Sequence, residues 1–267
     1  MRVNSAGFLG LERIGDDKFA LDVAARVATG GGFLFGGAGL GAGIAALEAV
    51  SQRRVVWATA QYLSYAMTGS RVTIDVTLAV RGHQITQGRA VCRVGDQEIL
   101  TVNAALGDRE FEATGQFLTM PVVAPPDECR PRIPRSEHAN SIMESLEQRV
   151  AKGRDIADLD GTPNDGRTIL WSRIPAVIEG VDAATLAILG DFVPMGIGQA
   201  LGLRAAGNSL DNTLRIVRLV PTEWVLLDIR IDAVQRGFGH GSIQMFATDG
   251  TLMATASQST IARLWKA

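Results

Sequence analysis

The sequence has little of several residue types on which common kinds of site depend. Its 267 residues include two cysteines and three histidines, and 26 Lys and Arg stand against 28 Asp and Glu, a formal net charge of −2. Cys92 and Cys129 cannot form the framework of a disulfide-rich secreted domain, and we interpret them as free thiols of a cytoplasmic protein. Without a basic excess, a nucleic-acid surface is not expected. The histidines, His83, His138 and His240, share no ligand spacing, so no metal site is expected.

No charged residue occurs from Val27 to Leu47, a run long enough to cross a bilayer. Eight of these residues are glycines, however, and Arg26 and Glu48 close the run tightly. A helix that is apolar on every side can also lie wholly inside a globular fold, and we favour that interpretation over a membrane span. Residues Met1–Arg13 lack a basic segment followed by an apolar one, so no signal peptide is expected.

Two parts of the chain share a pattern at a constant offset of 153 residues. Val72–Leu78 alternates apolar and polar residues as a half-buried strand does, and Val225–Ile231 repeats the pattern with Asp228 in the place of Asp75. The same shift, without a gap, aligns Gly88 with Gly241, Asp96 with Asp249 and Ile99 with Leu252. The chain is therefore predicted to be an internal duplication.

Each half is predicted to contain one apolar helix, at Gly31–Ala49 and at Ala183–Leu203, followed by four antiparallel strands. A curved sheet around each helix explains why neither helix has a polar face, and the glycines allow close approach of the sheet. The predicted fold is α+β, with two antiparallel sheets, each wrapped around a buried apolar helix and joined edge to edge. We place one domain at residues 1–115 and the other at 139–267, with a Pro-rich linker at 116–138.

An extended segment is also expected before each helix. In the first half it comprises Leu9–Ile14 and Lys18–Val23, and in the second half Leu146–Ala151 and Thr168–Ile174. Residues 139–151 are alternatively helical, although the repeat favours a strand at their end.

Asp191 is the one charged residue between Ala183 and Leu203. Carboxylates are seldom fully buried unless they are paired or functional, which makes Asp191 a candidate catalytic residue. A structural alternative is equally open: Asp191 caps a helix that restarts after Gly190, with Pro194 in its first turn.

Two further polar residues are candidates because their duplicate positions are apolar. Ser209 is expected at the start of a strand, and the offset of 153 pairs it with Val56. Gln258 lies in the last predicted strand, and the same offset pairs it with Ala105. Polarity in one copy alone is expected of a site that survives in one half only.

Other familiar motifs do not carry a function here. Gly37–Ala42 fits the loose dinucleotide pattern G-x-G-x-x-A, but alternating strands follow it in place of a βαβ unit. Gly207–Asp211 lacks the last glycine of a G-x-S-x-G nucleophile elbow. Because no histidine neighbours a serine or cysteine as a base, water is the expected nucleophile.

At this point the residues resemble the acyl-CoA thioesterase II family of double hot-dog proteins. Gly31 and Gly32 with the following helix resemble its first helix, and Gly190–Pro194 resembles its second-helix motif. Ser209–Thr213 is similar to the family string S/T-L-D-H-T, and Ala254–Gln258 is similar to its terminal strand.

The resemblance implies an acyl-CoA thioesterase of lipid metabolism, with no cofactor, in which Asp191, Ser209 and Gln258 hold the water that attacks the thioester. It also implies a protein that binds acyl-CoA. Association into homo-oligomers is left open, and the cytoplasmic location is expected from the two free cysteines. Asn212 stands where the family string has histidine. Two alternatives remain: a non-catalytic acyl-CoA-binding protein on the same scaffold, and a hydratase, for which no histidine beside Asp191 is visible.

Overall fold

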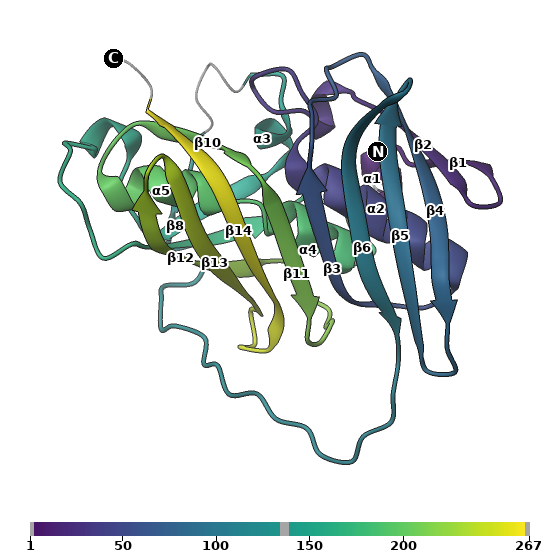
Figure 1. The fold of residues 1–267 in the computed structure, drawn as a ribbon. Coiled ribbons are helices and arrows are strands. Elements are labelled where there is room, and N and C mark those ends of the chain that lie inside the picture. Colours follow the sequence, from purple (N-terminus) through teal and green to yellow (C-terminus); the bar gives the residue numbers. More distant parts are fainter. Residues whose placement is uncertain (1–2, 134–138, 265–267) are drawn as a thin grey trace.

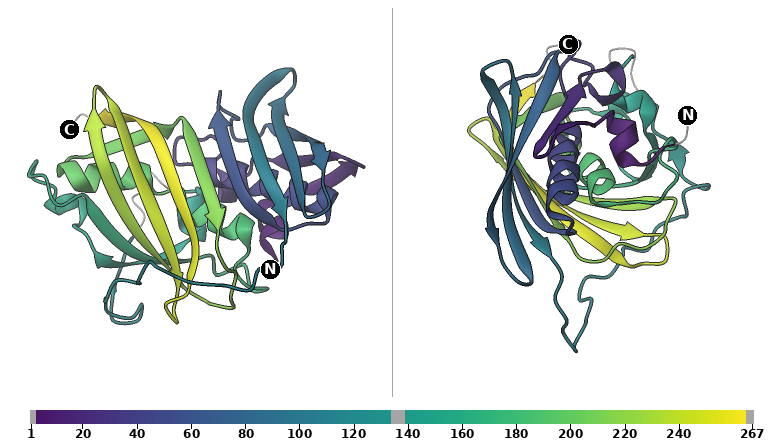
Figure 2. Two further views of the ribbon diagram at one scale, coloured as in Figure 1. Left: turned by 60° about the horizontal axis from the view of Figure 1, so that its bottom comes forward. Right: turned by 90° about the vertical axis from the view of Figure 1, so that its right-hand side faces the viewer.

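The computed structural model describes residues 3–133 and 139–264, so His138 and the end of the linker lie outside the described residues. The described strands form one 14-stranded antiparallel sheet, and the helices lie inside its curve (Figures 1 and 2). The first-half strands are β1 (Glu12–Gly15), β2 (Lys18–Asp22), β3 (Val55–Tyr62), β4 (Arg71–Arg81), β5 (Ile85–Val94) and β6 (Gln97–Gly107). The second-half strands are β7 (Arg130–Pro131), β8 (Glu147–Lys152), β9 (Arg167–Arg173), β10 (Ala205–Ser209), β11 (Asp211–Ile216), β12 (Val225–Gln235), β13 (Phe238–Ala247) and β14 (Leu252–Leu264).

The two halves meet where β3 pairs with β11 in the middle of the strand order. Across this pair Thr59 lies opposite Thr213, and their hydroxyl oxygens are 2.7 Å apart. The expected joining edge to edge is therefore present, but the product is one continuous sheet and not two sheets. Pairing the two edge strands satisfies backbone groups that would otherwise be exposed.

The register of the strands refines the repeat. Val76 pairs with Ala90 in the first half, and at the offset of 153 Ile229 pairs with Ile243. The hairpin between β13 and β14 is one residue longer than the one between β5 and β6, and it shifts the last strand.

This shift changes the predicted duplicate positions. Gly241 pairs with Gln258, whereas its counterpart Gly88 pairs with Ala104. The counterpart of Gln258 is thus Ala104, and the assignment of Ala105 was wrong.

By the same register the counterpart of Ser209 is Val55 and not Val56, since Ser209 pairs with Thr260 and Val55 with Leu106. Both counterparts are still apolar.

The two long helices differ from the predicted ranges in instructive ways. The first, α2 (Gly36–Ser51), begins five residues later than predicted. The second is divided into α4 (Ala183–Leu189) and α5 (Val193–Leu201). The shorter helices are α1 (Ser5–Leu9), α3 (Ile142–Ser145) and the 3-10 turns η1 (Ala25–Val27) and η3 (Ile156–Asp158). The strand predicted at the end of residues 139–151 is β8, and α3 precedes it.

Glycines on two sides of α2 allow two close contacts. A Cβ at Gly43 would lie 2.7 Å from Val102 on β6, the sheet contact that the sequence predicted. A Cβ at Gly37 would lie 2.6 Å from the carbonyl oxygen of Ala187 on α4. Glycine thus brings α2 against the sheet and also against the helix of the other half.

The segment Ala183–Leu201 is long and apolar enough to pass the composition test for a membrane-spanning helix. Within the described residues, 83% of its most apolar window is buried inside the protein, which is typical of a core helix. The uncharged run at Val27–Leu47, considered above, is likewise core: Leu40, Ile44 and Leu47 are fully buried.

In Figure 1 the linker runs below the lower ends of the second-half strands, and its side chains pack against the sheet on the face opposite the helices. There Met120, Val123 and Cys129 pack on a second, smaller core that contains Trp171 and Phe246. The indole of Trp171 donates a hydrogen bond to the carbonyl oxygen of Ala124 at 2.9 Å. The linker therefore shields apolar side chains that the helices cannot reach.

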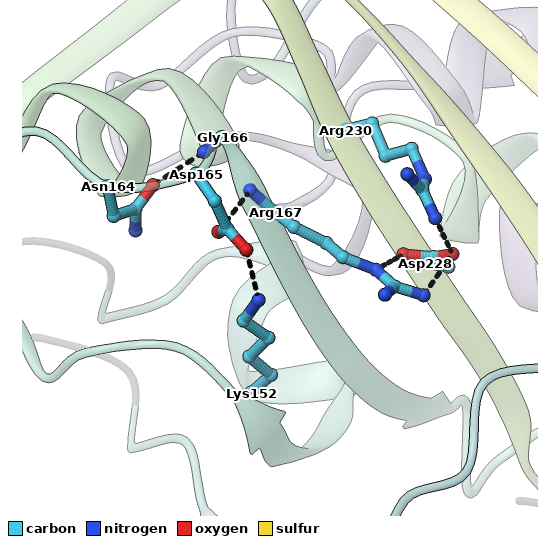
Figure 3. Close-up of polar contacts among 7 residues, drawn as sticks. All are labelled: Lys152, Asn164, Asp165, Gly166, Arg167, Asp228 and Arg230. Carbon is cyan, nitrogen blue, oxygen red and sulfur yellow. Dashed lines mark hydrogen bonds and ion pairs between the residues drawn. The ribbon is translucent and has the colours of Figure 1, made fainter.

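Asp75 and Asp228, the strand aspartates that the repeat aligns, are both ion-pair partners. Asp228 is 1% exposed and accepts two hydrogen bonds from Arg167, at 2.7 and 2.9 Å, while Arg230 approaches it at 3.4 Å (Figure 3). Asp75 pairs with Lys18 at 3.1 Å, but its side chain is 37% exposed. The repeated carboxylate is thus part of the scaffold and does not lie in the cavity described below.

Candidate active site

Asp191 occupies the break between α4 and α5 and is 6% exposed. It does not cap α5, because the residue at the N-cap is Phe192, without a side-chain capping bond. Its Oδ2 instead accepts a hydrogen bond from the backbone amide of Gly37, at 2.6 Å. The capping alternative is therefore wrong, and the carboxylate faces the beginning of α2 from the other half. A helix N-terminus favours negative charge there.

Gln258, on β14 and 2% exposed, holds this carboxylate. Its Nε2 donates to Oδ1 of Asp191 and lies 3.1 Å from the hydroxyl of Ser209. Its Oε1 accepts from the backbone amide of Val193 at 3.2 Å, in the first turn of α5. With both ends of the amide engaged, the orientation of Gln258 is fixed.

Ser209 is the last residue of β10, and not the start of a strand as expected. Leu210 separates β10 from β11, although both strands pair with β14. This irregularity places the hydroxyl of Ser209 beside Gln258. The three residues that the sequence selected, from three separate elements, therefore lie together.

The environment of Asp191 raises its pKa to about 7. The main cause is burial, which disfavours the charged form; hydrogen bonds from Gln258, Gly37 and Ser209 act in the opposite direction. A carboxyl group with a pKa near neutrality can both accept a proton from water and return it, as general acid–base catalysis needs.

A cavity of about 1460 Å³ opens beside this carboxylate. Asp191, Ser209 and Gly36 line it, and most of the remaining lining is apolar, with Leu100 and Leu170 among its walls. A large apolar cavity with a few convergent polar groups is the usual form of a small-molecule site.

Five arginines also line this cavity. Arg130 is paired with Asp155, and Arg154 with Asp160.

Arg204 and Arg263 are exposed and form no ion pair with another described residue. Arg204 directly precedes β10, and Arg263 pairs with Ala206 of that strand, so both lie at one end of the β10–β14 pair. The fifth, Arg132, donates to Oε1 of Gln148 at 2.5 Å. Positive charge thus collects along the cavity.

Sequence reasoning missed the contribution of the first half to this site. Gly37 and Tyr62 both belong to it, and Tyr62, at the end of β3, lines the cavity. The signal for Gly37 was the glycine pair that it forms with Gly36 inside the predicted helix, since an amide can bind a carboxylate closely where no side chain intervenes. Tyr62 carried no comparable signal. Among the described residues no group of three or more His, Cys, Asp or Glu could hold a metal ion.

The curved sheet, the buried carboxylate and the apolar cavity agree with the predicted thioester hydrolase, and so do the comparisons with known proteins. A family model described as "Acyl-CoA thioesterase C-terminal domain" matches residues 126–262. A protein from Novosphingobium aromaticivorans that is assigned as a thioesterase is 32% identical, with a TM-score of 0.83 over 96% of this chain and 98% of that chain. The chain belongs to the acyl-CoA thioesterase II family and is a thioester hydrolase.

Two more distant structures share the fold. A hot-dog protein from Alicyclobacillus acidocaldarius is 18% identical with a TM-score of 0.86, and 98% of each chain is covered. An acyl-CoA thioesterase II from Mycobacterium marinum is 18% identical with a TM-score of 0.76, covering 98% of this chain and 99% of that chain. No curated protein matches the chain.

Proposed function

We propose that the chain hydrolyses acyl-CoA to a free acid and CoA through a water molecule activated by Asp191. The observation that carries the proposal is the buried carboxylate of Asp191, oriented by Gln258 and Gly37 at the wall of an apolar cavity. Ser209 and Gln258 would position the water, since both lie beside the carboxylate.

The reaction needs one proton carrier. Asp191 takes a proton as the water oxygen bonds to the thioester carbon, and the carbonyl oxygen becomes negatively charged. When the carbonyl re-forms, the carbon–sulfur bond breaks, and Asp191 returns the proton to the CoA sulfur. No covalent acyl-enzyme forms, because Asp191 acts on water, and among the described contacts of Ser209 there is no histidine to serve as the base of a serine nucleophile.

The proposal gives the two halves different roles. Each hot-dog unit wraps its part of the sheet around its own helix, α2 or α4–α5, and one site serves both. The counterparts of Gln258 and Ser209 are Ala104 and Val55, and no acid occurs within α2 before Glu48, so the opposite position lacks the groups that hold water.

The positive charges along the cavity support CoA as the thiol part of the thioester substrate. CoA bears a diphosphate and a 3′-phosphate, and guanidinium groups bind phosphate oxygens in pairs. Arg204 and Arg263, without ion pairs to described residues, would bind these phosphates, while the apolar walls at Leu100 and Leu170 receive the acyl chain. Self-association and a cytoplasmic location stay predictions that no observation above addresses.

Replacement of Asp191 by asparagine tests the mechanism, because it keeps the shape and removes the base. General-base catalysis is worth about 10²–10⁴-fold, so kcat on a panel of acyl-CoAs is expected to fall by that factor. Binding of acyl-CoA should survive, since the base acts chiefly in the transition state. Asp96→Asn, in the exposed hairpin between β5 and β6, is the matched control. Near-full kcat in Asp191→Asn, or an acylated protein detected by mass spectrometry during turnover, would refute the mechanism.

A further inference from the structure

Tyr62 places a buried hydroxyl at the wall of the cavity. Its Oη is shielded from solvent and makes no hydrogen bond to another described residue. A buried polar group without a partner is costly, so its presence at a cavity wall calls for an explanation in function.

The hydroxyl borders the same small space as the carboxylate of Asp191. A Cβ placed on Gly36, the first residue of α2, would lie 2.8 Å from Oδ2 of Asp191 and 3.1 Å from Oη of Tyr62. Glycine at this position lets both oxygens lie close to the first residue of α2, and Gly36, Tyr62 and Asp191 all line the cavity. A carbonyl group that enters beside Gly36 would therefore meet an acid–base group and a hydroxyl donor together.

Asn212 is the neighbour of this hydroxyl on the adjoining strand. It lies on β11 opposite Ala60 of β3, is 1% exposed, and neither Oδ1 nor Nδ2 bonds to another described residue with ordinary geometry. Burial, Asp191 and Asp211 together raise the pKa of Tyr62 well above its usual value, whereas the amide of Asn212 lowers it. The phenol thus stays protonated at neutral pH, with the buried amide of Asn212 as a polar neighbour.

A donor at this position meets a need of the reaction. The backbone amide of Gly37 is bound to Asp191 itself and so cannot also serve the substrate. A thioester oxygen gains negative charge as water attacks, and preorganised donors at that oxygen supply much of the catalytic effect.

We propose that Tyr62 is a further catalytic residue, whose hydroxyl donates a hydrogen bond to the thioester carbonyl oxygen as that oxygen becomes negative. Asn212 is its positioning residue: once substrate is bound, the unpaired Nδ2 would donate to Oη and leave the phenolic hydrogen directed toward the cavity. No proton is transferred, because the oxygen loses its charge when the carbonyl re-forms and the CoA sulfur leaves. The proposal rests on water attack at the Asp191 site.

The chain offers a close control, because Tyr62 and Tyr65 are its two tyrosines. The Tyr65 side chain is half exposed at the edge of the same cavity, and its hydroxyl pairs with Asn208. Tyr62→Phe is expected to lower kcat about 10²-fold, as expected for the loss of one oxyanion donor. Tyr65→Phe should lower kcat much less than Tyr62→Phe, because the Tyr65 hydroxyl already pairs with Asn208 and does not border Asp191.

Binding is measured separately with a thioether analogue of acyl-CoA, which cannot be hydrolysed. Its Kd should be similar for Tyr62→Phe and the parent, because the donor acts on charge that develops later. A tenfold weaker Kd with unchanged kcat would overturn the proposal, since Tyr62 would then be a binding residue only. Unchanged kcat in Tyr62→Phe beside a large loss in Asp191→Asn would refute this proposal and leave the proposed function standing, whereas unchanged kcat in both would refute both.

Asn212 supplies a second, spectroscopic test that does not depend on the Tyr62→Phe variant being folded. In the Tyr65→Phe background the phenolate absorbance at alkaline pH reports on Tyr62 alone. Asn212→Leu should raise the pKa of Tyr62 and lower kcat, while Asn212→His, which restores a ring N–H donor, should reverse both changes. If the pKa of Tyr62 is the same in all three proteins, Asn212 is not the positioning residue, and the proposal fails.

Discussion

Asp191 and Gly37 come from different halves of the chain, and the carboxylate of one accepts a hydrogen bond from the backbone amide of the other. The contact forms because glycine lets α2 approach α4 until a side chain at Gly37 would clash with the carbonyl of Ala187. The site therefore depends on the packing of the two halves against each other, and neither half contains it alone.

The pH profile of hydrolysis should follow the ionisation of Asp191. Because its pKa is about 7 and the base is the ionised form, kcat/KM should rise about tenfold per pH unit below this value and level off above it. Steady-state rates between pH 5 and 9 measure the profile, and Asp96→Asn should reproduce it. A flat profile through this range would contradict the assigned base.

The free energy of unfolding should depend on the same ionisation, but it should fall as pH rises, whereas kcat/KM increases. The pKa of Asp191 is higher in the folded state than the ordinary value for an aspartate, so the unfolded state releases the proton more readily. The folded state therefore loses stability relative to the unfolded state as pH rises from about 4 through 7. Between pH 5 and 8 we expect the parent to lose about 2–3 kcal/mol of unfolding free energy relative to Asp191→Asn.

Urea denaturation of both proteins at the two pH values measures this difference. Comparison with Asp191→Asn removes the contribution of every other titrating group. Parallel changes in the two proteins would show that Asp191 is not desolvated as described.

Replacement of Arg204 and Arg263 should raise KM only for substrates that carry phosphate groups. The double replacement Arg204→Gln with Arg263→Gln is expected to raise KM for acyl-CoA about tenfold or more, since charge-assisted hydrogen bonds contribute about 1.5–3 kcal/mol each. The acyl-pantetheine thioester, which carries no phosphate, should be hydrolysed equally by both proteins. Arg218→Gln, an exposed arginine that does not line the cavity, is the control. Equal losses on both substrates would instead indicate damage to the site.

Loss of the buried carboxylate of Asp228 should lower the free energy of unfolding far more than loss of its more exposed duplicate, Asp75. Asp228→Asn removes the partner of Arg167 in a buried ion pair, a change that typically costs about 3–5 kcal/mol. Asp75→Asn removes a half-exposed partner of Lys18 and should cost at most about 1 kcal/mol. Unfolding free energies from denaturant titration give both values, and similar costs at the two positions would contradict the difference in burial.

Much of the fold could be predicted because its signals are local. The alternation at Val72–Leu78 and its copy at Val225–Ile231 identified the paired strands, and an isolated Asp191 in an apolar helix identified the carboxylate. The domain limits at 115 and 139 stay predictions.

The remainder could not be predicted because it depends on register and packing. A hairpin one residue longer moved the counterpart of Gln258 to Ala104, and no pattern in the sequence encodes that shift. Nor could the sequence bring Gly37 or Tyr62 to Asp191, since these contacts connect residues more than a hundred positions apart. Acyl-chain preference likewise depends on the depth of the cavity, which packing alone determines.

The pairing of β3 with β11 has an evolutionary consequence. In a dimer of identical subunits each substitution appears twice, so a residue that is lost at one site is lost at both. Within a single fused chain the two halves accept substitutions independently. The second half can then keep Asp191, Ser209 and Gln258, while the first is free to change at Val55 and Ala104 and to specialise as the wall, with Gly37 and Tyr62, of a site that it no longer duplicates.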